Sequence, residues 1–153
     1  MKTFFSIAAV LLVLLLGSVW WSKSSEKMDP DTISITGIHW HPKLEVYVNG
    51  EKQKIPPNIG IGPQYVLLPN FDRKMGMTAI HTHADVTQGI IHLEFNSAVH
   101  KNDIKLSRFF EIWGKDFRDF GKNAVMTVNG IGSAEFENYI MRDKDKIILR
   151  YSN

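Results

Sequence analysis

Two segments of this sequence end in the same tripeptide, Val-Asn-Gly, and this feature constrains the fold more than any other. In "LEVYVNG", residues 44–50, apolar side chains alternate with other side chains up to Asn49-Gly50, and "AVMTVNG" ends in the same way at Asn129-Gly130. An Asn-Gly pair after an alternating strand is the strongest short signal of a β-hairpin, because both residues accept the positive φ angles of a type I′ turn. The sequence therefore predicts two β-hairpins, with "EKQKI" as the returning strand of the first.

The residues between these hairpins predict a long loop followed by two short strands. Pro56 to Met77 contains four prolines and three glycines, so we expect a loop of the kind that often serves as a lid, with a short strand at Tyr65 to Leu68. A strand near Thr78 to His83, a turn at Ala84 to Gln88 and a strand at "GIIHLEF" should follow. These elements carry most of the histidines of the chain.

One helix is predicted after these strands. Leu106, Phe109, Phe110 and Trp113 have the i, i+3, i+4, i+7 spacing of an amphipathic helix, and Gly114 is a typical stop. This aromatic stripe is typical of core packing rather than of a ligand platform. The segment "NYIMRDKDKIILRY" predicts two further strands around a charged turn at residues 143–145. The fold class is therefore α+β: a mainly antiparallel sheet with β-hairpins and one short amphipathic helix.

The N-terminus predicts a membrane anchor. Phe4 to Trp21 contains no charged residue over 18 positions, Lys2 precedes it, and Trp20 and Trp21 stand where an interfacial aromatic belt would fall. The alternative is a cleaved signal peptide, but no A-x-A-like cleavage site follows the apolar run. We expect a transmembrane anchor at 1–22, a polar tether at 23–32 and an extracytoplasmic domain at 33–153.

The composition narrows the partners and the ligand chemistry. The formal net charge of +2 and the absence of basic blocks argue against a nucleic-acid partner. The chain has no cysteine, so a metal site would rely on imidazole, carboxylate, thioether or backbone oxygen ligands. The sequence identifies no protein partner.

Five of the six histidines are predicted on the same face of their strands. Side chains alternate along a strand, so a His-x-His pair points both imidazoles to one face, about 6.5–7 Å apart. Apolar residues occupy positions next to the histidines, on the opposite face of the strand, in "TAIHTH" and "GIIHLEF". The same holds in "IHWHPKLEVYV" if the register continues through Pro42. The predicted metal ligands on the face away from the core are His39, His41, His81, His83, His92 and Glu94.

A metal ion explains this gathering better than chance does. Without metal, five neighbouring histidines with ordinary pKa values of about 6.5 would repel one another as they protonate, whereas neutral imidazole is a common ligand of first-row metals. Copper and zinc are the favoured ions. Met75 and Met77 could add soft ligands for Cu(I), although packing of the loop is the favoured explanation for this pair. His100, in a polar segment, is interpreted as an ordinary surface histidine.

The ordered combination of "HWHPKLEVYVNGEKQKIPPNIGI", "HTHADVTQGIIHLEF", "LSRFFEIWGKDF" and "ENYIMRDKDKIILRY" resembles a family of membrane-anchored, extracytoplasmic, His-rich domains of bacteria and archaea. The resemblance covers nearly all of Ile38 to Tyr151 and implies a domain identity without an assigned activity. In that family an acidic residue often follows His-Thr-His directly. Here Ala84 intervenes before Asp85, which leaves a ligand role for this carboxylate open.

Three functions remain compatible with the sequence. The first is a membrane-tethered metal-binding protein that captures or hands on copper or zinc outside the cytoplasm. The second is a metalloenzyme in which His81, His83 and His92 hold an ion with an open position for water, and Glu94 acts as a base or orients a ligand. The third is a metal-free interaction domain whose histidines respond to pH.

Overall fold

The computed structural model of this chain describes residues 6–7, 11–18 and 29–152. Residues 11–18 are helical, and no helix within the described residues is both long and apolar enough to cross a membrane. Of the anchor predicted at 1–22 and the tether predicted at 23–32, residues 1–5, 8–10 and 19–28 lie outside the described residues. Asp31 to Asn153 forms one compact unit by its internal contacts.

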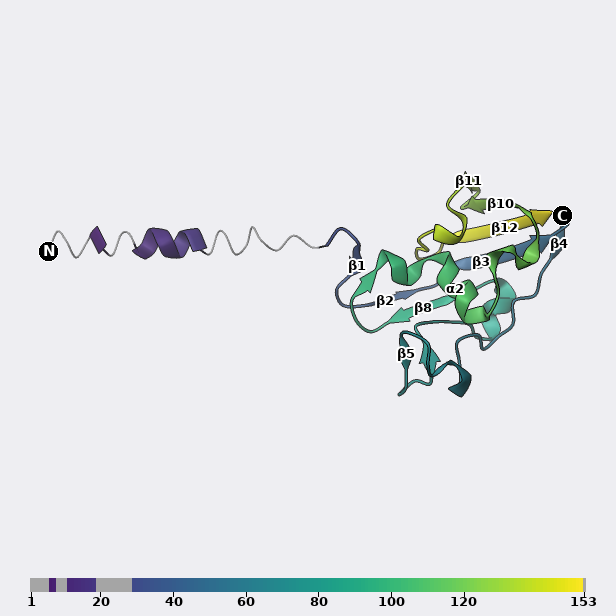
Figure 1. The fold of residues 1–153 in the computed structure, drawn as a ribbon, viewed down its shortest axis with the longest axis horizontal. Helices are drawn as coiled ribbons and strands as arrows, with labels where there is room; N and C mark the ends of the chain where they lie inside the picture. Colours follow the sequence, from purple (N-terminus) through teal and green to yellow (C-terminus); the bar gives the residue numbers. More distant parts are fainter. Residues whose placement is uncertain (1–5, 8–10, 19–28, 153) are drawn as a thin grey trace. The chain divides into compact units, whose positions relative to one another are not determined.

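The larger sheet of this unit contains both predicted hairpins (Figure 1). Asn49 and Gly50 have φ angles of 49° and 87°, and Asn129 and Gly130 have φ angles of 52° and 84°. These paired positive values fit the type I′ turns expected from the sequence. The sheet has the strand order β11-β10-β12-β3-β4, and its strands are β3 (Lys43–Val48), β4 (Glu51–Lys52), β10 (Asn123–Val128), β11 (Ile131–Ser133) and β12 (Lys146–Ser152).

The centre of this sheet is a parallel pair that the sequence did not indicate. β12 runs parallel to β3, with Ile147 opposite Leu44 and Leu149 opposite Val46, whereas β10 and β4 pair antiparallel with their neighbours. These four apolar side chains are fully buried. Burial of alternate residues therefore joins two segments about a hundred positions apart in the chain.

A three-stranded antiparallel sheet carries the histidines. Its order is β2-β8-β7, and its strands are β2 (Ile38–Trp40), β7 (Ile80–His81) and β8 (His92–Phe95). The pairing of β2 with β8 continues past Pro42, whose carbonyl accepts a hydrogen bond from the Ile91 N–H at 2.9 Å, while the Leu44 N–H donates to the Gly89 carbonyl at 2.8 Å. The register therefore continues through Pro42, and one chain segment passes from the small sheet into the large one.

The helix α2 (Leu106–Trp113) matches the sequence expectation residue for residue. Leu106, Phe109 and Phe110 are buried, and Gly114 ends the helix with a left-handed φ of 71°. Phe110 of this helix contacts Phe117 of the 3-10 helix η4 (Phe117–Phe120), and Phe117 and Phe120 in turn contact Tyr151 of β12. In Figure 1, α2 lies in front of β3 and β8.

Two predicted strands are wrong. Of the residues expected as a strand at Tyr65 to Leu68, Tyr65 ends a 3-10 helix, η1 (Pro63–Tyr65), and the others form a turn and a bend, because Pro63 sets a helical φ at the start of η1. Before the 143–145 turn, Ile140 forms only an isolated bridge with Lys105. Only the strand after that turn, β12, is formed.

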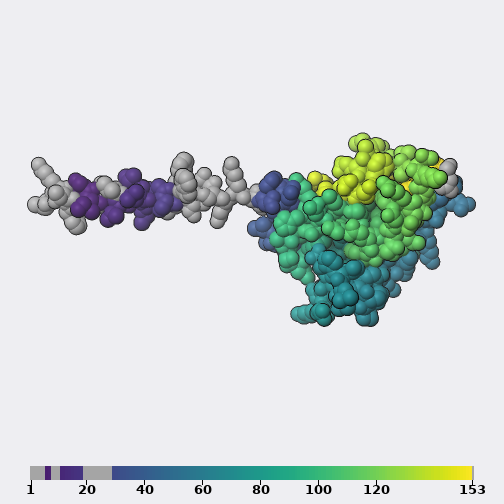
Figure 2. All heavy atoms as spheres, in the orientation of Figure 1, coloured from purple at the N-terminus to yellow at the C-terminus, as the bar shows by residue number. Residues whose placement is uncertain are grey.

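The remaining short elements complete the unit. The long loop contains a small hairpin of β5 and β6, and its blue-green spheres form the lower part of this unit in Figure 2. A second two-stranded pair joins β1 to β9 at the beginning of the unit. These elements are β1 (Thr32–Ser34), β5 (Phe71–Asp72), β6 (Met77–Thr78), β9 (Val99–His100), η2 (Ala84–Gln88), η3 (Lys101–Ile104) and η5 (Phe136–Asn138).

Candidate metal centre

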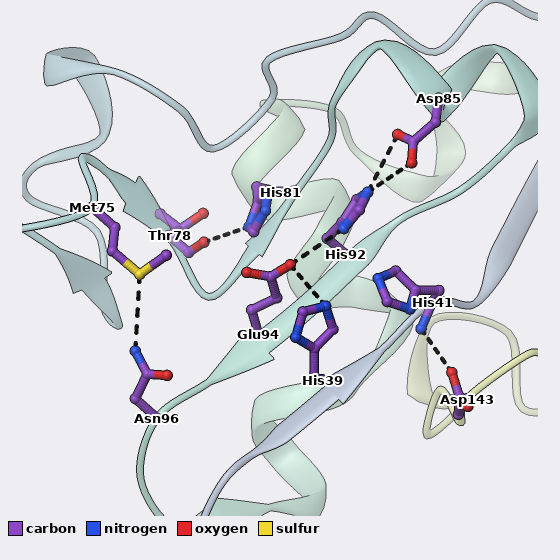
Figure 3. A network of polar contacts seen from close by, with 10 residues as sticks. All are labelled: His39, His41, Met75, Thr78, His81, Asp85, His92, Glu94, Asn96 and Asp143. Carbon is purple, nitrogen blue, oxygen red and sulfur yellow. Dashed lines mark hydrogen bonds and ion pairs between the residues drawn. The ribbon is translucent and has the colours of Figure 1, made fainter.

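The small sheet brings all six predicted ligand residues together. In its register, His39 lies opposite Glu94 and His81 lies opposite His92. His41 and His83 each follow two positions after a strand histidine and complete the His-x-His pairs. Figure 3 shows that His39, His81, His92 and Glu94 extend from neighbouring strands towards one region, with His41 beside them.

The five imidazole rings form one continuous group with His92 at its centre. The His92 ring centroid lies 4.8 Å from those of His41 and His83 and 5.3 Å from that of His81. The same 4.8 Å separates the rings of His39 and His41. The histidines that the sequence placed on one face of their strands therefore lie side by side, but His81 and His92 are buried and not exposed on an outer face.

The candidate ligand atoms divide into two triads. His81, His83 and His92 form the buried triad, and His39, His41 and Glu94 form the exposed triad; within each, one ligand atom per residue lies within 4.8 Å of the others. Zinc binds nitrogen at about 2.0–2.1 Å, which places two ligands of a tetrahedral ion about 3.3 Å apart. Small side-chain movements would therefore close either triad around an ion.

His81 is held with one nitrogen directed into the cluster. Its side chain is fully buried, and Nδ1 lies 2.9 Å from the Thr78 carbonyl oxygen. Because a carbonyl only accepts, Nδ1 carries the proton and Nε2 of the neutral ring has a free lone pair. Nε2 is buried and has no hydrogen-bond partner among the described residues. A buried acceptor without a partner is rare in folded proteins, and a metal ion would satisfy this one.

Burial also keeps the His81 ring neutral. Loss of solvent lowers the pKa of His81 to about 4, and this effect outweighs the opposing influence of the Thr78 carbonyl and the Glu94 carboxylate. The nearby His83 and His92 lower the pKa further. At neutral pH this ring is therefore in the form that binds metal.

His92 is oriented by a carboxylate. Its Nε2 lies 3.0 and 3.2 Å from the two oxygens of Asp85, so Nε2 carries the proton and donates it. The other nitrogen, Nδ1, is buried, makes no hydrogen bond within the described residues, and lies 3.4 Å from Glu94 Oε1. A carboxylate that holds the far nitrogen of a ligand histidine is the usual outer partner of a metal site. Asp85 thus has the position of an orienting group, which the sequence left open.

In the exposed triad, His39 contacts Glu94 and His41 is fixed through its backbone. His39 Nε2 is 3.2 Å from Glu94 Oε1, and 64% of the His39 side-chain surface is exposed, against 22% for Glu94. The backbone N–H of His41 donates to Asp143 Oδ1 at 2.9 Å, so the turn before β12 fixes this end of β2. Asp143 could not be assigned this role from the sequence, because it lies about a hundred positions from His41.

The first part of the long loop is a fixed cover and not a free lid. The Thr82 side chain donates to the Pro56 carbonyl at 3.0 Å and accepts from the Ile59 N–H at 3.0 Å, while the Asn58 N–H donates to the Thr82 carbonyl at 2.9 Å. Gly60 lies against β6 and β7, where its carbonyl accepts from the Thr78 N–H at 2.8 Å. This loop edge accounts for the complete burial of His81.

The second part of the loop forms one wall of a cavity beside the triads. The cavity has a volume of about 190 Å³, and its wall includes Met75, Met77, His81 and Glu94. Met75 is half exposed, and its sulfur lies 4.0 Å from the amide nitrogen of Asn96. The two methionines are therefore near the cluster but are not members of either triad.

His100, interpreted from the sequence as a surface histidine, lies outside both triads. It is exposed, and its Nδ1 is 3.5 Å from Asp103 Oδ2 in η3.

Comparisons of the chain with models of protein families, with curated proteins and with solved structures found no match.

Proposed function

We propose that this chain is a membrane-tethered extracytoplasmic protein that binds a transition metal ion, copper or zinc, through its histidine cluster. The observation that carries the proposal is the pair of buried nitrogens without a hydrogen-bond partner among the described residues, Nε2 of His81 and Nδ1 of His92, the second of which lies 3.4 Å from Glu94 Oε1. In each ring the other nitrogen is occupied, by a carbonyl or by a carboxylate. This arrangement directs one nitrogen of each ring into the buried triad, and a divalent ion is a partner that suits them.

The location outside the cytoplasm rests on the sequence. The uncharged run at Phe4 to Trp21 and the preceding Lys2 support an N-terminal anchor with a cytoplasmic end. The chain has no cysteine, so its candidate ligands are imidazole and carboxylate. The resemblance to a family of membrane-anchored His-rich domains also supports a location outside the cytoplasm.

Elemental analysis tests this proposal directly. The full chain, purified in detergent without a histidine tag, is expected to retain stoichiometric metal after desalting or to take up zinc or Cu(II) at micromolar free concentration. If copper is bound, electron paramagnetic resonance will report nitrogen ligands. A chain that neither retains nor takes up metal would contradict the proposal and leave the metal-free, pH-responsive alternative.

Substitution of the buried triad should remove the ion. The double substitution His81→Ala and His83→Ala is expected to abolish binding, and His100→Ala should leave it unchanged. Because His81 is fully buried, loss of its ring leaves a cavity, so the single substitution of the partly exposed His83 is the safer variant. His83→Ala should weaken binding at least tenfold while the chain still unfolds cooperatively.

A metalloenzyme is the second candidate, and the cavity beside His81 and Glu94 favours it. An ion held by three imidazoles keeps a fourth position for water, and Glu94 would be the base that accepts its proton. Water exchange at this position can be measured by paramagnetic relaxation of the solvent with Cu(II) or Co(II) bound. A saturated ion with no exchangeable water would exclude this candidate and leave the binding function.

A further inference from the structure

We infer that the cluster holds two metal ions, one in the buried triad and one in the exposed triad, with the Glu94 carboxylate between them. This inference rests on the proposed metal-binding function and specifies how many ions are bound and which of them exchanges.

The first argument is the distribution of the donor atoms. The six side chains meet the distance condition for a shared ion as two groups of three. Ligands on opposite sides of a first-row ion are separated by at most about 4.2 Å, twice the metal–nitrogen distance. Zinc in protein sites is almost always four-coordinate, so one zinc ion would not take all six donors, whereas each triad offers three and leaves a position for water.

The second argument is the position of Glu94. Its Oε1 lies 3.2 Å from His39 Nε2 in the exposed triad and 3.4 Å from His92 Nδ1 in the buried triad. Both nitrogens are candidate ligand atoms, so one carboxylate oxygen lies at the boundary of the two sites. A carboxylate has two oxygens and about four lone-pair sites, which allows it to serve an ion on each side.

The third argument is the negative charge around the cluster. Two dications close together repel each other, and this repulsion is reduced only by anions between or beside them. Glu94 lies between the triads, and Asp85 neutralises the buried side through His92. These two carboxylates offset part of the four positive charges, so the second ion binds more weakly than the first.

The two ions differ in access to solvent. Two side chains of the buried triad, His81 and His92, are buried and only His83 reaches solvent, whereas in the other triad 64% of the His39 side-chain surface is exposed. The ion of the buried triad is therefore the retained one, and the ion of the exposed triad is the exchangeable one. In this arrangement the ion of the buried triad exchanges slowly, and the ion of the exposed triad is the one that passes to a partner ligand.

Zinc titration of the metal-free full chain in detergent tests this inference, with bound metal counted by elemental analysis. Wild type should bind two equivalents, and removal by excess EDTA should proceed in two phases of equal size whose rates differ at least tenfold. The double substitution His39→Ala and His41→Ala should bind one equivalent, lose the fast phase and keep the affinity of the slow site within threefold. Glu94→Gln, which keeps the shape and removes the charge, should also bind one equivalent, and His100→Ala should bind two.

Each alternative outcome identifies what has failed. If wild type binds one equivalent, the two-ion inference is overturned while the metal-binding function stands. If the His39 and His41 substitutions remove all metal, a single site with mixed ligands is present, and the inference is again overturned. If wild type binds no zinc or Cu(II) at all, the proposed function itself fails.

Discussion

The substitution Asp85→Asn tests whether Asp85 orients a ligand histidine without binding the ion itself. The Asp85 carboxylate oxygens accept a hydrogen bond from the His92 Nε2–H at 3.0 and 3.2 Å, and this leaves the Nδ1 lone pair for the metal. Asparagine keeps the size of the side chain but removes the charge, and its NH₂ group can donate to Nε2. When the asparagine NH₂ donates to Nε2, the ring proton must sit on Nδ1, where it prevents metal binding.

The expected magnitude follows from the strength and the exposure of this contact. Loss of such an outer partner typically weakens metal affinity 10- to 100-fold, or about 1.4–2.8 kcal/mol. Asp85 keeps 34% of its side-chain surface exposed, so solvent screening places the effect in the lower part of this range. We expect zinc affinity to fall about 10- to 30-fold, with unchanged stoichiometry.

Competition against a chromogenic chelator at pH 7.5 measures this affinity, and Co(II) absorption reports the coordination geometry. The matched control is Asp103→Asn, because Asp103 also contacts a histidine, His100, but lies outside both triads. Its metal affinity should equal that of wild type even if its thermal stability falls. An Asp85→Asn affinity within threefold of wild type would refute the orienting role, and loss of a whole equivalent would show that Asp85 is a direct ligand.

Three further predictions concern stability. Burial lowers the pKa of His81 from 6.5 to about 4, so below pH 6.5 the unfolded chain binds a proton at this residue and the folded chain does not. The metal-free protein should therefore lose stability as the pH falls from 6.5 towards 4. A thermal midpoint no lower at pH 5 than at pH 7.5 would contradict this. Gly60→Ala should destabilise the loop next to His81, because a Cβ at this φ of +78° would lie 2.6 Å from the Ile80 carbonyl oxygen. Gly76→Ala, at a φ of +72° with open space around it, is the control and should show only the backbone strain. Equal urea midpoints for the two variants would contradict the role of the close contact at Gly60. Asp145→Asn should lower the free energy of unfolding by about 2 kcal/mol or more, measured with urea, and should leave the metal stoichiometry unchanged. The reason is that the buried carboxylate accepts hydrogen bonds from the Tyr139 hydroxyl at 2.7 Å and from two other donors. A decrease below about 0.5 kcal/mol would show that the amide replaces the carboxylate fully.

Local patterns were sufficient for the elements whose conformation depends on neighbouring residues. The Asn-Gly turns, the helix at Leu106–Trp113 and its Gly114 stop all form as expected. The strand at Tyr65 to Leu68 was wrong, because apolar residues alone did not outweigh the helical start that Pro63 provides. The strand predicted before the 143–145 turn is absent for a local reason that periodicity did not reveal, because the Tyr139 hydroxyl and the Arg142 N–H both donate to the Asp145 carboxylate, six and three residues further on.

The candidate ligands themselves were determined by the sequence, because strand alternation is a local geometric rule. A His-x-His spacing directs both rings to one face wherever the strand lies, and the six residues named from this rule are the six that the sheet brings together. Which of them share an ion depends on strand order and register, which pair residues up to about fifty positions apart. That information is absent from any local window. Only the tertiary structure therefore decided that the cluster divides at Glu94, that Asp85 and the Thr78 carbonyl fix the ring nitrogens, and that a loop edge removes His81 from water.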